Sequence, residues 1–504
     1  MKIQDFINAL NRAGLLTGVD PEYLEAPYSR EVSSVTYNSR EAAKGVLFVC
    51  KGAHFKEQYL DDAISSGAAC YVSEKKYGRG NENCPEITVS DIRLAMPVIA
   101  ETFYGRLSGE ISMIGITGTK GKSTTAYFMR YILDEYMSAE GEKRTAICSG
   151  IENYDGLIEE ESHLTTPEIM ELYSHMKNAL DSGIKYLTME VSSQGLRYNR
   201  VDTIEFEAGA FLNIGSDHIS PIEHPDFEDY FSAKLLLFSH CRKAAINLDC
   251  EEQERIKEAS KECPCVITFS QIQKDANVYC HSVRSNEGKV NIRVRGKDID
   301  NYPDFDEQFE LGTFGTINVE NALAAISMSA LLAVPVEHIK NGLAKAKSPG
   351  RMEVFYSENG KRIAIVDYAH NKLSYEKFFE TIKEEFPGKK MIIVFGCPGK
   401  KAIARREELG TIAGQNCEYC IITEEDYGEE DVNKICNEIA GFVGAAGGKY
   451  EIITDRVEAI KKAISIMDDD TILFLPGKGR ETREKRGNKY VDTPSDTEVV
   501  EKYL

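Results

Sequence analysis

The chain has 504 residues, of which 42% are hydrophobic, and its 60 Lys and Arg against 81 Asp and Glu give a formal net charge of −21. This length corresponds to about three domains, and the apolar content is enough for a core in each. The acidic balance argues against a nucleic-acid-binding protein, which needs a basic face, and against docking on an anionic membrane.

The N-terminal sequence "MKIQDFINALNRAGLL" is too polar for a secretory signal, and no stretch approaches the ~18 uninterrupted apolar residues of a membrane span. The 13 cysteines are an odd number in a large chain, which is typical of reduced thiols and predicts a cytoplasmic protein. We expect a monomer that acts on small molecules, without a nucleic-acid or membrane partner.

Residues 1–108 predict a small mixed α/β N-terminal domain, in which the β-rich segments "GVLFVC" and "ACYVSE" flank the helical "EQYLDDAISSGA". From residue 109 to 346, buried strands alternate with helices, beginning with the strand "ISMIGITG" and the helix "KSTTAYFMRYILDEYM". This alternation predicts a central domain with a P-loop-type, parallel, doubly wound sheet. Residues 275–310 alternate polar and apolar residues and predict an antiparallel hairpin, followed by the helix "NVENALAAISMSALLA".

A Pro-Gly break in "KSPGRME" predicts the next boundary. The strands "RIAIVDYA", "KMIIVFG", "YCIITEE", "YEIIT" and "TILFLPG" then indicate a C-terminal Rossmann-like domain over residues 347–504. Cys417 and Cys420 form a lone CxxC in "CEYCIIT". We interpret both as core residues of a buried strand, because no second pair stands at the spacing of a zinc site.

The segment "GITGTKGKSTT" has the order strand, glycine-rich loop, helix, which suits an anion because backbone N–H groups and the helix N-terminus face the ligand. It departs from the standard phosphate loop, since Ile116 stands where the first glycine belongs. Lys122 would reach the terminal phosphates and Ser123 would offer a hydroxyl to Mg²⁺. The ATP-binding residues that we predict in the loop are Gly118, Thr119, Lys120, Gly121, Lys122, Ser123 and Thr124.

"GTKGKST" resembles the ATP loop of the Mur ligase and folylpolyglutamate synthase superfamily, G-T-x-G-K-[ST]. Seven residues farther along match the superfamily in order: Glu190, His218, Lys234, Asn318, Asn321, Arg351 and Asp367. The resemblance implies ATP and two Mg²⁺ sites, with Lys122, Glu190, His218 and Lys234 as catalytic residues. It implies Ser123, Glu190, His218 and a carbamylated Lys234 as metal ligands. It also implies Asn318, Asn321, Arg351, Asp367 and His370 as further ATP-binding residues.

Within the superfamily the chain resembles the MurE type, whose acceptor is UDP-N-acetylmuramoyl-L-alanyl-D-glutamate. The segment "SSVTYNSREAAKGVLFVCKG" is similar to the uridine-binding domain of MurE, although Asn38 replaces an aspartate and Lys44 a proline. The folate-adding relatives lack this domain. "LTTPE" and "SSQGLRYNR" match the peptide-binding segments, where hydroxyls and an arginine suit carboxylates. The implied UDP-substrate-binding residues are Ser39, Thr165, Thr166, Ser192 and Arg200.

The incoming amino acid depends on "TEEDYGEED", where six of nine residues are acidic. Gly428 stands where the MurE enzymes that use meso-diaminopimelate have an arginine that binds its extra carboxylate. Carboxylates pair with an ammonium, so L-lysine is favoured, L-ornithine is an alternative and meso-diaminopimelate is disfavoured. A solvated acidic loop is the other interpretation. Arg480 in "KGRE" replaces a histidine, and Lys401 replaces an arginine. The implied amino-acid-binding residues are Lys401, Glu425, Asp426, Gly477 and Glu481.

The sequence therefore predicts an ATP-dependent amide ligase of peptidoglycan precursor synthesis, which activates the D-glutamate carboxylate as an acyl phosphate. One alternative is a ligase of the same superfamily with another acceptor, such as a folylpolyglutamate synthase-like enzyme. Another is a nucleotide-binding scaffold without activity, which the presence of Lys122, Glu190, His218 and Lys234 argues against.

Overall fold

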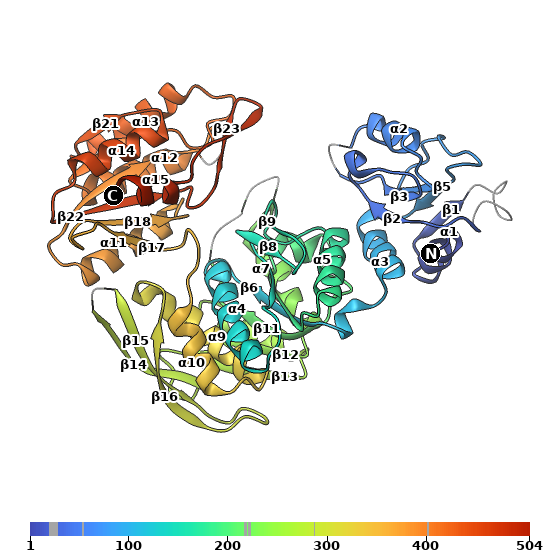
Figure 1. Cartoon of the computed structure of the whole chain (residues 1–504), viewed down its shortest axis with the longest axis horizontal. Coiled ribbons are helices and arrows are strands. Elements are labelled where there is room, and N and C mark those ends of the chain that lie inside the picture. The colour runs from blue at the N-terminus through green and yellow to red at the C-terminus, as the bar shows by residue number, and fades with distance from the viewer. Residues whose placement is uncertain (20–28, 53–54, 216–218, 220–222, 287, 401–402) are drawn as a thin grey trace. The chain divides into compact units, whose positions relative to one another are not determined.

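The structure is a computed structural model that describes residues 1–19, 29–52, 55–215, 219, 223–286, 288–400 and 403–504. The chain forms two compact units (Figure 1). Unit 1 comprises residues 1–279, 296–304 and 323–339, and unit 2 comprises residues 280–295, 305–322 and 340–504. The predicted division into three domains at residues 108 and 346 stays a prediction.

The N-terminal part of unit 1 is a five-stranded sheet in the order β1-β5-β4-β3-β2, flanked by helices. Strands β2 to β5 are parallel and β1 is antiparallel to β5, so the predicted mixed α/β fold is confirmed. Its elements are α1 (Ile3–Arg12), β1 (Leu16–Val19), β2 (Ser34–Thr36), η3 (Ser39–Glu41), β3 (Val46–Val49), α2 (Glu57–Ser65), β4 (Cys70–Ser73), β5 (Glu86–Val89), α3 (Ile92–Tyr104) and η4 (Leu107–Gly109).

The rest of unit 1 is built on a sheet with β6 near its centre, in the order β13-β12-β11-β6-β10-β7-β8-β9. Strands β13 to β7 are parallel, as predicted, whereas β8 and β9 form an antiparallel edge. Its elements are β6 (Ser112–Thr117), α4 (Lys122–Ala139), β7 (Ala146–Cys148), β8 (Glu152–Tyr154), β9 (Glu159–Glu161), α5 (Ile169–Asp181), β10 (Tyr186–Glu190), α6 (Ser193–Arg197), β11 (Phe206–Phe211), α7 (Phe227–Leu235), η5 (Leu236–His240), β12 (Lys243–Asn247), α8 (Gln253–Ser260), β13 (Cys265–Ser270) and α9 (Val319–Leu331).

Unit 2 contains β14, β15 and β16 and a six-stranded sheet in the order β17-β18-β22-β19-β20-β21. Only β17 is antiparallel to its neighbour in this sheet, so the predicted Rossmann-like arrangement is confirmed. The elements are β14 (Val278–Asn286), β15 (Lys289–Gly296), β16 (Phe305–Leu311), η6 (Thr316–Asn318), α10 (Val336–Lys345), β17 (Glu353–Tyr356), β18 (Ile363–Asp367), α11 (Lys372–Glu385), β19 (Lys390–Phe395), α12 (Ala404–Asn416), β20 (Tyr419–Ile422), α13 (Val432–Ala445), β21 (Tyr450–Ile452), α14 (Arg456–Ile466), β22 (Thr471–Pro476), β23 (Arg483–Arg486), β24 (Lys489–Asp492) and α15 (Asp496–Tyr503).

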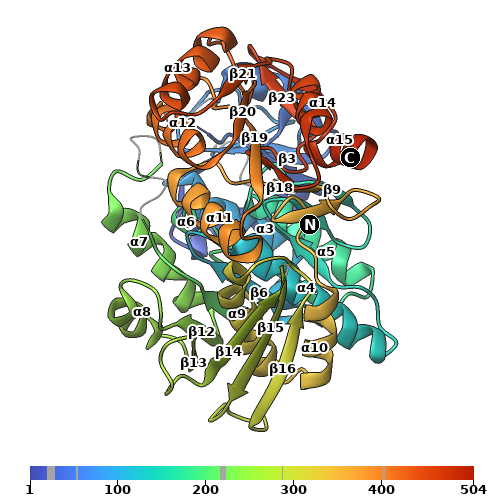
Figure 2. The same ribbon diagram turned by 90° about the vertical axis from the view of Figure 1, so that its left-hand side faces the viewer.

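Helices cover both faces of this sheet, α12 and α13 on one side and α14 and α15 on the other (Figure 2). The strands are therefore buried on both faces, which explains their continuous apolar runs such as "TILFLP" in β22. Polar loops leave the carboxyl ends of β18, β19, β20 and β22 at one edge, where open parallel sheets bind ligands.

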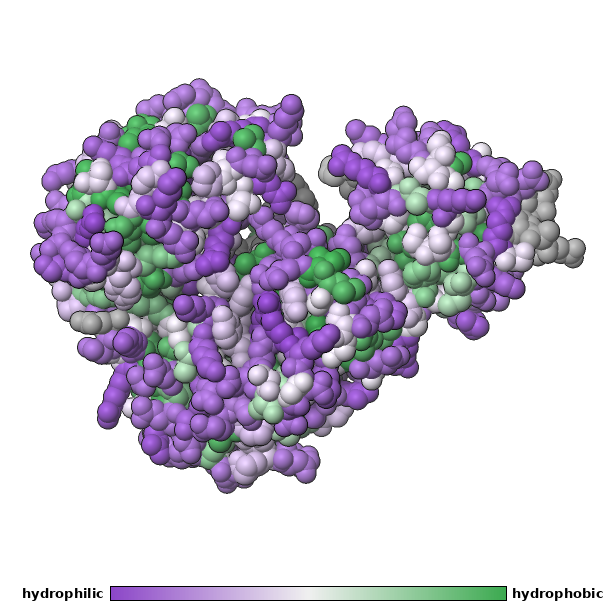
Figure 3. Space-filling model, viewed as in Figure 1, coloured by the Kyte–Doolittle hydropathy of each residue, from purple (hydrophilic) through white to green (hydrophobic). Residues whose placement is uncertain are grey.

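None of the thirteen cysteines forms a disulfide bond. Cys420 lies in β20 as predicted, but Cys417 follows the end of α12 instead of lying in the strand, because that helix continues to Asn416. In the part of the chain that the structure describes, no helix is long and apolar enough to cross a membrane. The face drawn in Figure 3 is covered mainly by hydrophilic residues, as the charge content of 28% leads one to expect.

Candidate active site

The phosphate loop joins β6 to α4 and depends on two glycines with positive φ. Gly118 has φ +153°, and a Cβ there would lie 2.9 Å from Leu212 Cβ; Gly121 has φ +85° and caps α4. Asn213 holds the loop, since its side-chain oxygen accepts from Lys120 N at 2.9 Å and its backbone oxygen from Thr119 N at 3.0 Å. The loop residues thus surround the N-terminus of an 18-residue helix, where an anion is stabilised.

Two lysines converge on this loop from different helices. The Nζ atoms of Lys122 and Lys234 each donate to the backbone oxygen of Gly118, at 2.9 Å in both cases. Lys234 is only 1% exposed and lies over the ring of Tyr230, at 4.7 Å from its centroid. The hydroxyl of Tyr230 in turn lies 3.0 Å from Thr119 Oγ1. The structure therefore brings Lys122 and Lys234 together at the loop, while their catalytic roles and the carbamylation of Lys234 stay predictions.

Glu190 ends β10, the strand beside β6, and is only 2% exposed. Its Oε1 accepts a hydrogen bond from Gly150 N at 2.7 Å. Ser123 lies in the first turn of α4. A hydroxyl and a carboxylate are hard oxygen ligands, and they fit Mg²⁺, which takes few ligands from protein and the rest from phosphates and water. Among the described residues no group of three or more His, Cys, Asp or Glu could hold a metal ion by itself, and His218 lies outside them.

A second polar cluster in unit 1 surrounds Thr166 and Arg200. Thr166 Oγ1 bonds to Ser192 Oγ at 3.0 Å and donates to the backbone oxygen of Glu190, also at 3.0 Å, which connects this cluster to the phosphate loop's neighbour strand. Arg200 pairs with Glu168 at 2.9 Å and donates to the backbone oxygen of Thr166 at 3.0 Å. Thr165 lies beside Gly150, whose Cβ would be 3.4 Å from Thr165 Oγ1. The predicted Thr165, Thr166, Ser192 and Arg200 are thus neighbours.

Lys51 and Glu168, which were not among the predicted site residues, complete this cluster. Lys51 pairs with Glu168 at 2.6 Å, and both line a cavity of about 110 Å³ together with Arg200. Burial lowers the pKa of Lys51, and its pairing with Glu168 opposes that shift. Ser39 makes no hydrogen bond or ion pair with the cluster among the described residues, but Tyr37 contacts it, because the ammonium of Lys51 lies 4.5 Å from the centroid of the Tyr37 ring.

In unit 2, the predicted ATP-binding residues are held by local hydrogen bonds. Asn321 donates to Asn318 Oδ1 at 3.1 Å, and Asn318 donates to the backbone oxygen of Phe314 at 2.8 Å. At the end of β18, the two carboxylate oxygens of Asp367 accept from the backbone N–H groups of Met352 and Ala369, both at 2.7 Å.

The guanidinium of Arg351 stacks over the ring of Tyr368, 4.6 Å from its centroid. His370 Nδ1 lies 2.7 Å from the backbone oxygen of Tyr368. Arg480, which replaces the histidine of the family motif, pairs with Glu353 in the "GRME" segment, and its backbone N–H donates to the hydroxyl of Tyr368 at 3.1 Å. Arg351, Asp367 and His370 thus lie around one short segment, and Arg480 connects it to the loop after β22.

The acidic loop, residues 423–431, follows β20, and most of its carboxylates pair with other residues of the protein. Its pairs are Glu424 with Arg486, Asp426 with Lys478, Glu429 with Lys400 and Glu430 with Arg406, and Asp431 caps α13. The loop also pairs with the β23–β24 hairpin, since Gly428 N donates to Lys485 O at 2.9 Å and Gly487 N to Gly428 O at 2.8 Å. The acidic loop is therefore a folded element, and five of its six acidic residues have partners inside the protein.

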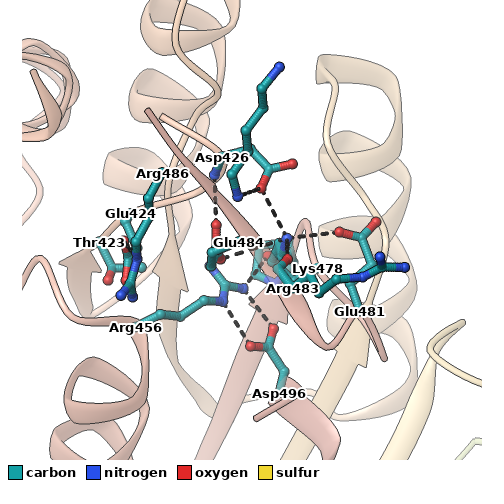
Figure 4. Close-up of polar contacts among 12 residues, drawn as sticks. Thr423, Glu424, Asp426, Arg456, Lys478, Glu481, Arg483, Glu484, Arg486 and Asp496 are labelled. Atoms are coloured by element: carbon teal, nitrogen blue, oxygen red, sulfur yellow. Dashed lines mark hydrogen bonds and ion pairs between the residues drawn. The ribbon is translucent and has the colours of Figure 1, made fainter. Parts of the chain in front are cut away.

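Glu425 is the exception, because no hydrogen bond or ion pair of its carboxyl group is found among the described residues. This group lies over Gly477, where φ is +101° and a Cβ would be 2.4 Å from Glu425 Oε2. Burial raises the pKa of Glu425 to about 8, although the charge of Arg456 opposes the shift. Lys478 connects the other predicted residues, since its Nζ lies 3.3 Å from Asp426 Oδ1 and 2.8 Å from Glu481 Oε2 (Figure 4). The structure thus groups Glu425, Asp426, Gly477 and Glu481, while Lys401 lies outside the described residues.

Two family models match the chain, the Mur ligase middle domain over residues 116–329 and the Mur ligase glutamate ligase domain over residues 350–479. A UDP-N-acetylmuramoyl-L-alanyl-D-glutamate–L-lysine ligase of Enterococcus faecalis is 36% identical over 90% of this chain and 88% of its own length. The enzyme of the same name from Streptococcus pneumoniae is 35% identical over the full length of both chains.

Solved structures give the same fold. A UDP-N-acetylmuramoyl-L-alanyl-D-glutamate–2,6-diaminopimelate ligase covers 99% of this chain and 98% of its own, with a TM-score of 0.65 at 22% identity. A MurF ligase of Thermotoga maritima, solved in complex with ADP, covers 88% of this chain and 93% of its own, with a TM-score of 0.59 at 18% identity.

Proposed function

The chain belongs to the Mur ligase family, and on that premise we propose that it adds a basic amino acid, L-lysine first, to the D-glutamate of UDP-N-acetylmuramoyl-L-alanyl-D-glutamate. ATP drives the reaction, and ADP and phosphate are released. Such a reaction belongs to peptidoglycan precursor synthesis, in the cytoplasm. The choice of a basic amino acid rests on the carboxyl group of Glu425, for which no hydrogen-bond or ion-pair partner is found among the described residues.

The phosphate loop supports ATP as the energy source, and the ADP complex of the Thermotoga maritima MurF is in keeping with it. Lys122, the loop N–H groups and the N-terminus of α4 would bind the β- and γ-phosphates. Ser123 and Glu190 would hold one Mg²⁺, and His218 with carbamylated Lys234 a second. When bound, Mg²⁺ neutralises negative charge on the phosphate oxygens.

The hydroxyl and arginine cluster of unit 1 would bind the acceptor. Thr165, Thr166, Ser192 and Arg200 offer hydroxyls and a guanidinium, which suit the carboxylates of a muramoyl dipeptide. Thr166 is bonded to the backbone of Glu190, so an acceptor carboxylate in this cluster lies near the residue proposed to hold the metal. Phosphorylation of that carboxylate gives an acyl phosphate, which the amine of the incoming amino acid attacks with release of phosphate.

The acidic loop favours a side chain with a positive charge and no second carboxylate. Glu425 would pair with the side-chain ammonium, and Gly428 offers no cation to a distal carboxylate such as that of meso-diaminopimelate. L-Ornithine, with a shorter side chain and the same charge, is the second candidate. Domain boundaries near residues 108 and 346 and a monomeric state are part of the same proposal.

The test is a substrate panel with purified protein, ATP, Mg²⁺ and UDP-muramoyl dipeptide, in which phosphate release is measured with L-lysine, L-ornithine and meso-diaminopimelate. We expect release with L-lysine, and a product whose mass increases by one lysine residue. Activity with meso-diaminopimelate alone would contradict the proposal. Folate-dependent release that survives deletion of residues 1–108 would favour a ligase with another acceptor.

A further inference from the structure

Lys478 is an internal cation in the amino-acid region that the sequence interpretation did not include. It follows β22 directly after Gly477, and only 3% of its surface is exposed. Its Nζ donates to the backbone oxygen of Arg483 at 2.7 Å and lies 2.8 Å from Glu481 Oε2 and 3.3 Å from Asp426 Oδ1 (Figure 4). Burial lowers the pKa of Lys478, but Glu481, Glu484 and Asp426 outweigh it and raise the pKa well above its ordinary value. The side chain is therefore an ammonium at neutral pH.

The carboxylates around Lys478 outnumber it. Glu484 is 1% exposed; its Oε2 accepts from Asp426 N at 2.8 Å, and its Oε1 lies 3.7 Å from Lys478 Nζ without a hydrogen-bond partner among the described residues. The nearby guanidinium of Arg456 is paired with Asp496 through two hydrogen bonds of 2.6 and 2.7 Å, and its charge also favours the ionised form of Glu425. Lys478 Nζ thus lies 2.8 to 3.7 Å from three carboxyl groups, and Glu425 adds a fourth acidic group.

This arrangement also determines the shape of the acidic loop. The bond from Lys478 to Arg483 O fixes the start of β23. From that strand, Lys485 N donates to Asp426 Oδ1 at 2.7 Å, on the same oxygen that faces Lys478. The residue before Asp426 is Glu425, so the backbone that carries Glu425 is held through Asp426 by the ammonium of Lys478.

We propose that Lys478 is a positioning residue of the amino-acid site. Its ammonium pairs with Asp426 and Glu481, so that Glu425 is left to pair with the single cationic side chain of the substrate. The inference rests on the proposed function. Without Lys478, the carboxyl groups of Asp426, Glu481 and Glu484 would lose the cation that lies among them, the acidic loop would lose its fixed form, and free cations would enter where the ammonium now lies. With it, the site has room for one further positive charge, and a substrate carboxylate is repelled.

The test uses the full-length enzyme with Lys478→Ala, which removes the equivalent of n-propylammonium. We expect the KM for L-lysine to rise about 30-fold or more, while the KM values for ATP and UDP-muramoyl dipeptide stay within about twofold of wild type. Millimolar n-propylammonium chloride restores a low KM for L-lysine in this variant, and n-propanol or sodium chloride at the same concentration does not. Lys489→Ala, which removes an exposed lysine of the adjacent strand β24, is the matched control and leaves all three KM values unchanged.

Lys478→Met keeps most of the side-chain volume without the charge, and it provides a second variant if the alanine variant does not fold. A high KM for L-lysine in Lys478→Met, at a melting temperature near that of wild type, supports the inference. A wild-type KM for L-lysine in either folded variant overturns the inference. So does a KM for ATP that rises as much as the KM for L-lysine, and so does a KM for L-lysine that propylammonium does not restore. If wild type itself rejects every basic amino acid, the proposed function fails, which is a different result from a wild-type enzyme that uses lysine and does not depend on Lys478.

Discussion

The phosphate loop and the acidic loop both follow a parallel strand at its carboxyl end, but they present charge in different ways. In the phosphate loop, Lys122 and Lys234 donate to the backbone oxygen of Gly118 from two different helices. In the acidic loop, carboxylates pair with Lys and Arg side chains from distant segments. The number of charges in a loop therefore says little about how many remain for a ligand, because five of the six acidic residues of this loop already have partners.

The largest effect is expected at the phosphate loop. Lys122→Ala removes the ammonium nearest the proposed phosphates, and we expect kcat to fall about 10³-fold, because phosphoryl transfer depends on charge neutralisation. Phosphate release at saturating substrates measures this loss. Lys143→Ala, at an exposed position after α4, is the control. A wild-type kcat in Lys122→Ala would contradict the catalytic role proposed for Lys122.

At the acidic loop, Glu425→Gln keeps the shape and removes the carboxyl group for which no partner is found in the part of the chain that the structure describes. We expect the KM for L-lysine to rise about 10- to 100-fold, as the loss of a charged hydrogen bond predicts, with little change in the KM for ATP. Glu429→Gln, on an exposed residue that already pairs with Lys400, should change neither value. If the KM for L-lysine rises as much in Glu429→Gln as in Glu425→Gln, the acidic loop acts through its total charge, and Glu425 has no special role.

The attachment of the acidic loop to the β23–β24 hairpin can be weakened at Arg486. Arg486→Ala leaves Glu424, which is 5% exposed, without its ion-pair partner. An unpaired buried carboxylate costs about 1–3 kcal/mol, so the free energy of unfolding in urea should fall by that amount. Unchanged unfolding would mean that the hairpin is not coupled to the stability of unit 2.

The smallest effect is a pH dependence. The pKa of Glu425 is raised from 4.5 to about 8, chiefly by burial, so its carboxyl group is mostly neutral at pH 7 and mostly ionised at pH 9. The lysine ammonium pairs with the ionised form, and the KM for L-lysine should therefore fall by up to about tenfold between these values. A raised folded-state pKa also means that this group makes folding less favourable as pH rises from 4.5 to 8. Glu425→Gln should abolish both trends, and a parallel fall of KM in that variant would assign the titration to another group.

The parts of the site that lie within one strand–loop–helix segment could be predicted from sequence. "GTKGKST" requires Gly118 and Gly121 for their backbone conformation, and the local order places Lys122 and Ser123 at a helix N-terminus. Glu190 and Thr166 could be predicted because they lie at the ends of strands or in short segments similar to the family. The alternation of strands and helices along the chain likewise predicted both parallel sheets.

Long-range pairs could not be predicted in this way. Nothing near Lys51 indicates Glu168, and "TEEDYGEED" carries no sign that Arg406 and Arg486 neutralise parts of it. The six acidic residues therefore suggested a pocket with many carboxylates. In the structure, Glu425 is the acidic residue of this loop for which no partner is found among the described residues. Lys478 belonged to the recognised "KGRE" segment, but its position among Asp426, Glu481 and Glu484 depends on a hairpin that only the folded chain creates.

The most direct measurement of the central claim is the ratio of kcat/KM for L-lysine to that for meso-diaminopimelate, with wild-type enzyme at saturating ATP and UDP-muramoyl dipeptide. Glu425 as the partner of an ammonium, and a glycine at position 428 in place of an arginine, predict a ratio of about 100 or more in favour of L-lysine. A ratio near one, or one in favour of meso-diaminopimelate, would contradict the account of how the acidic loop selects its substrate.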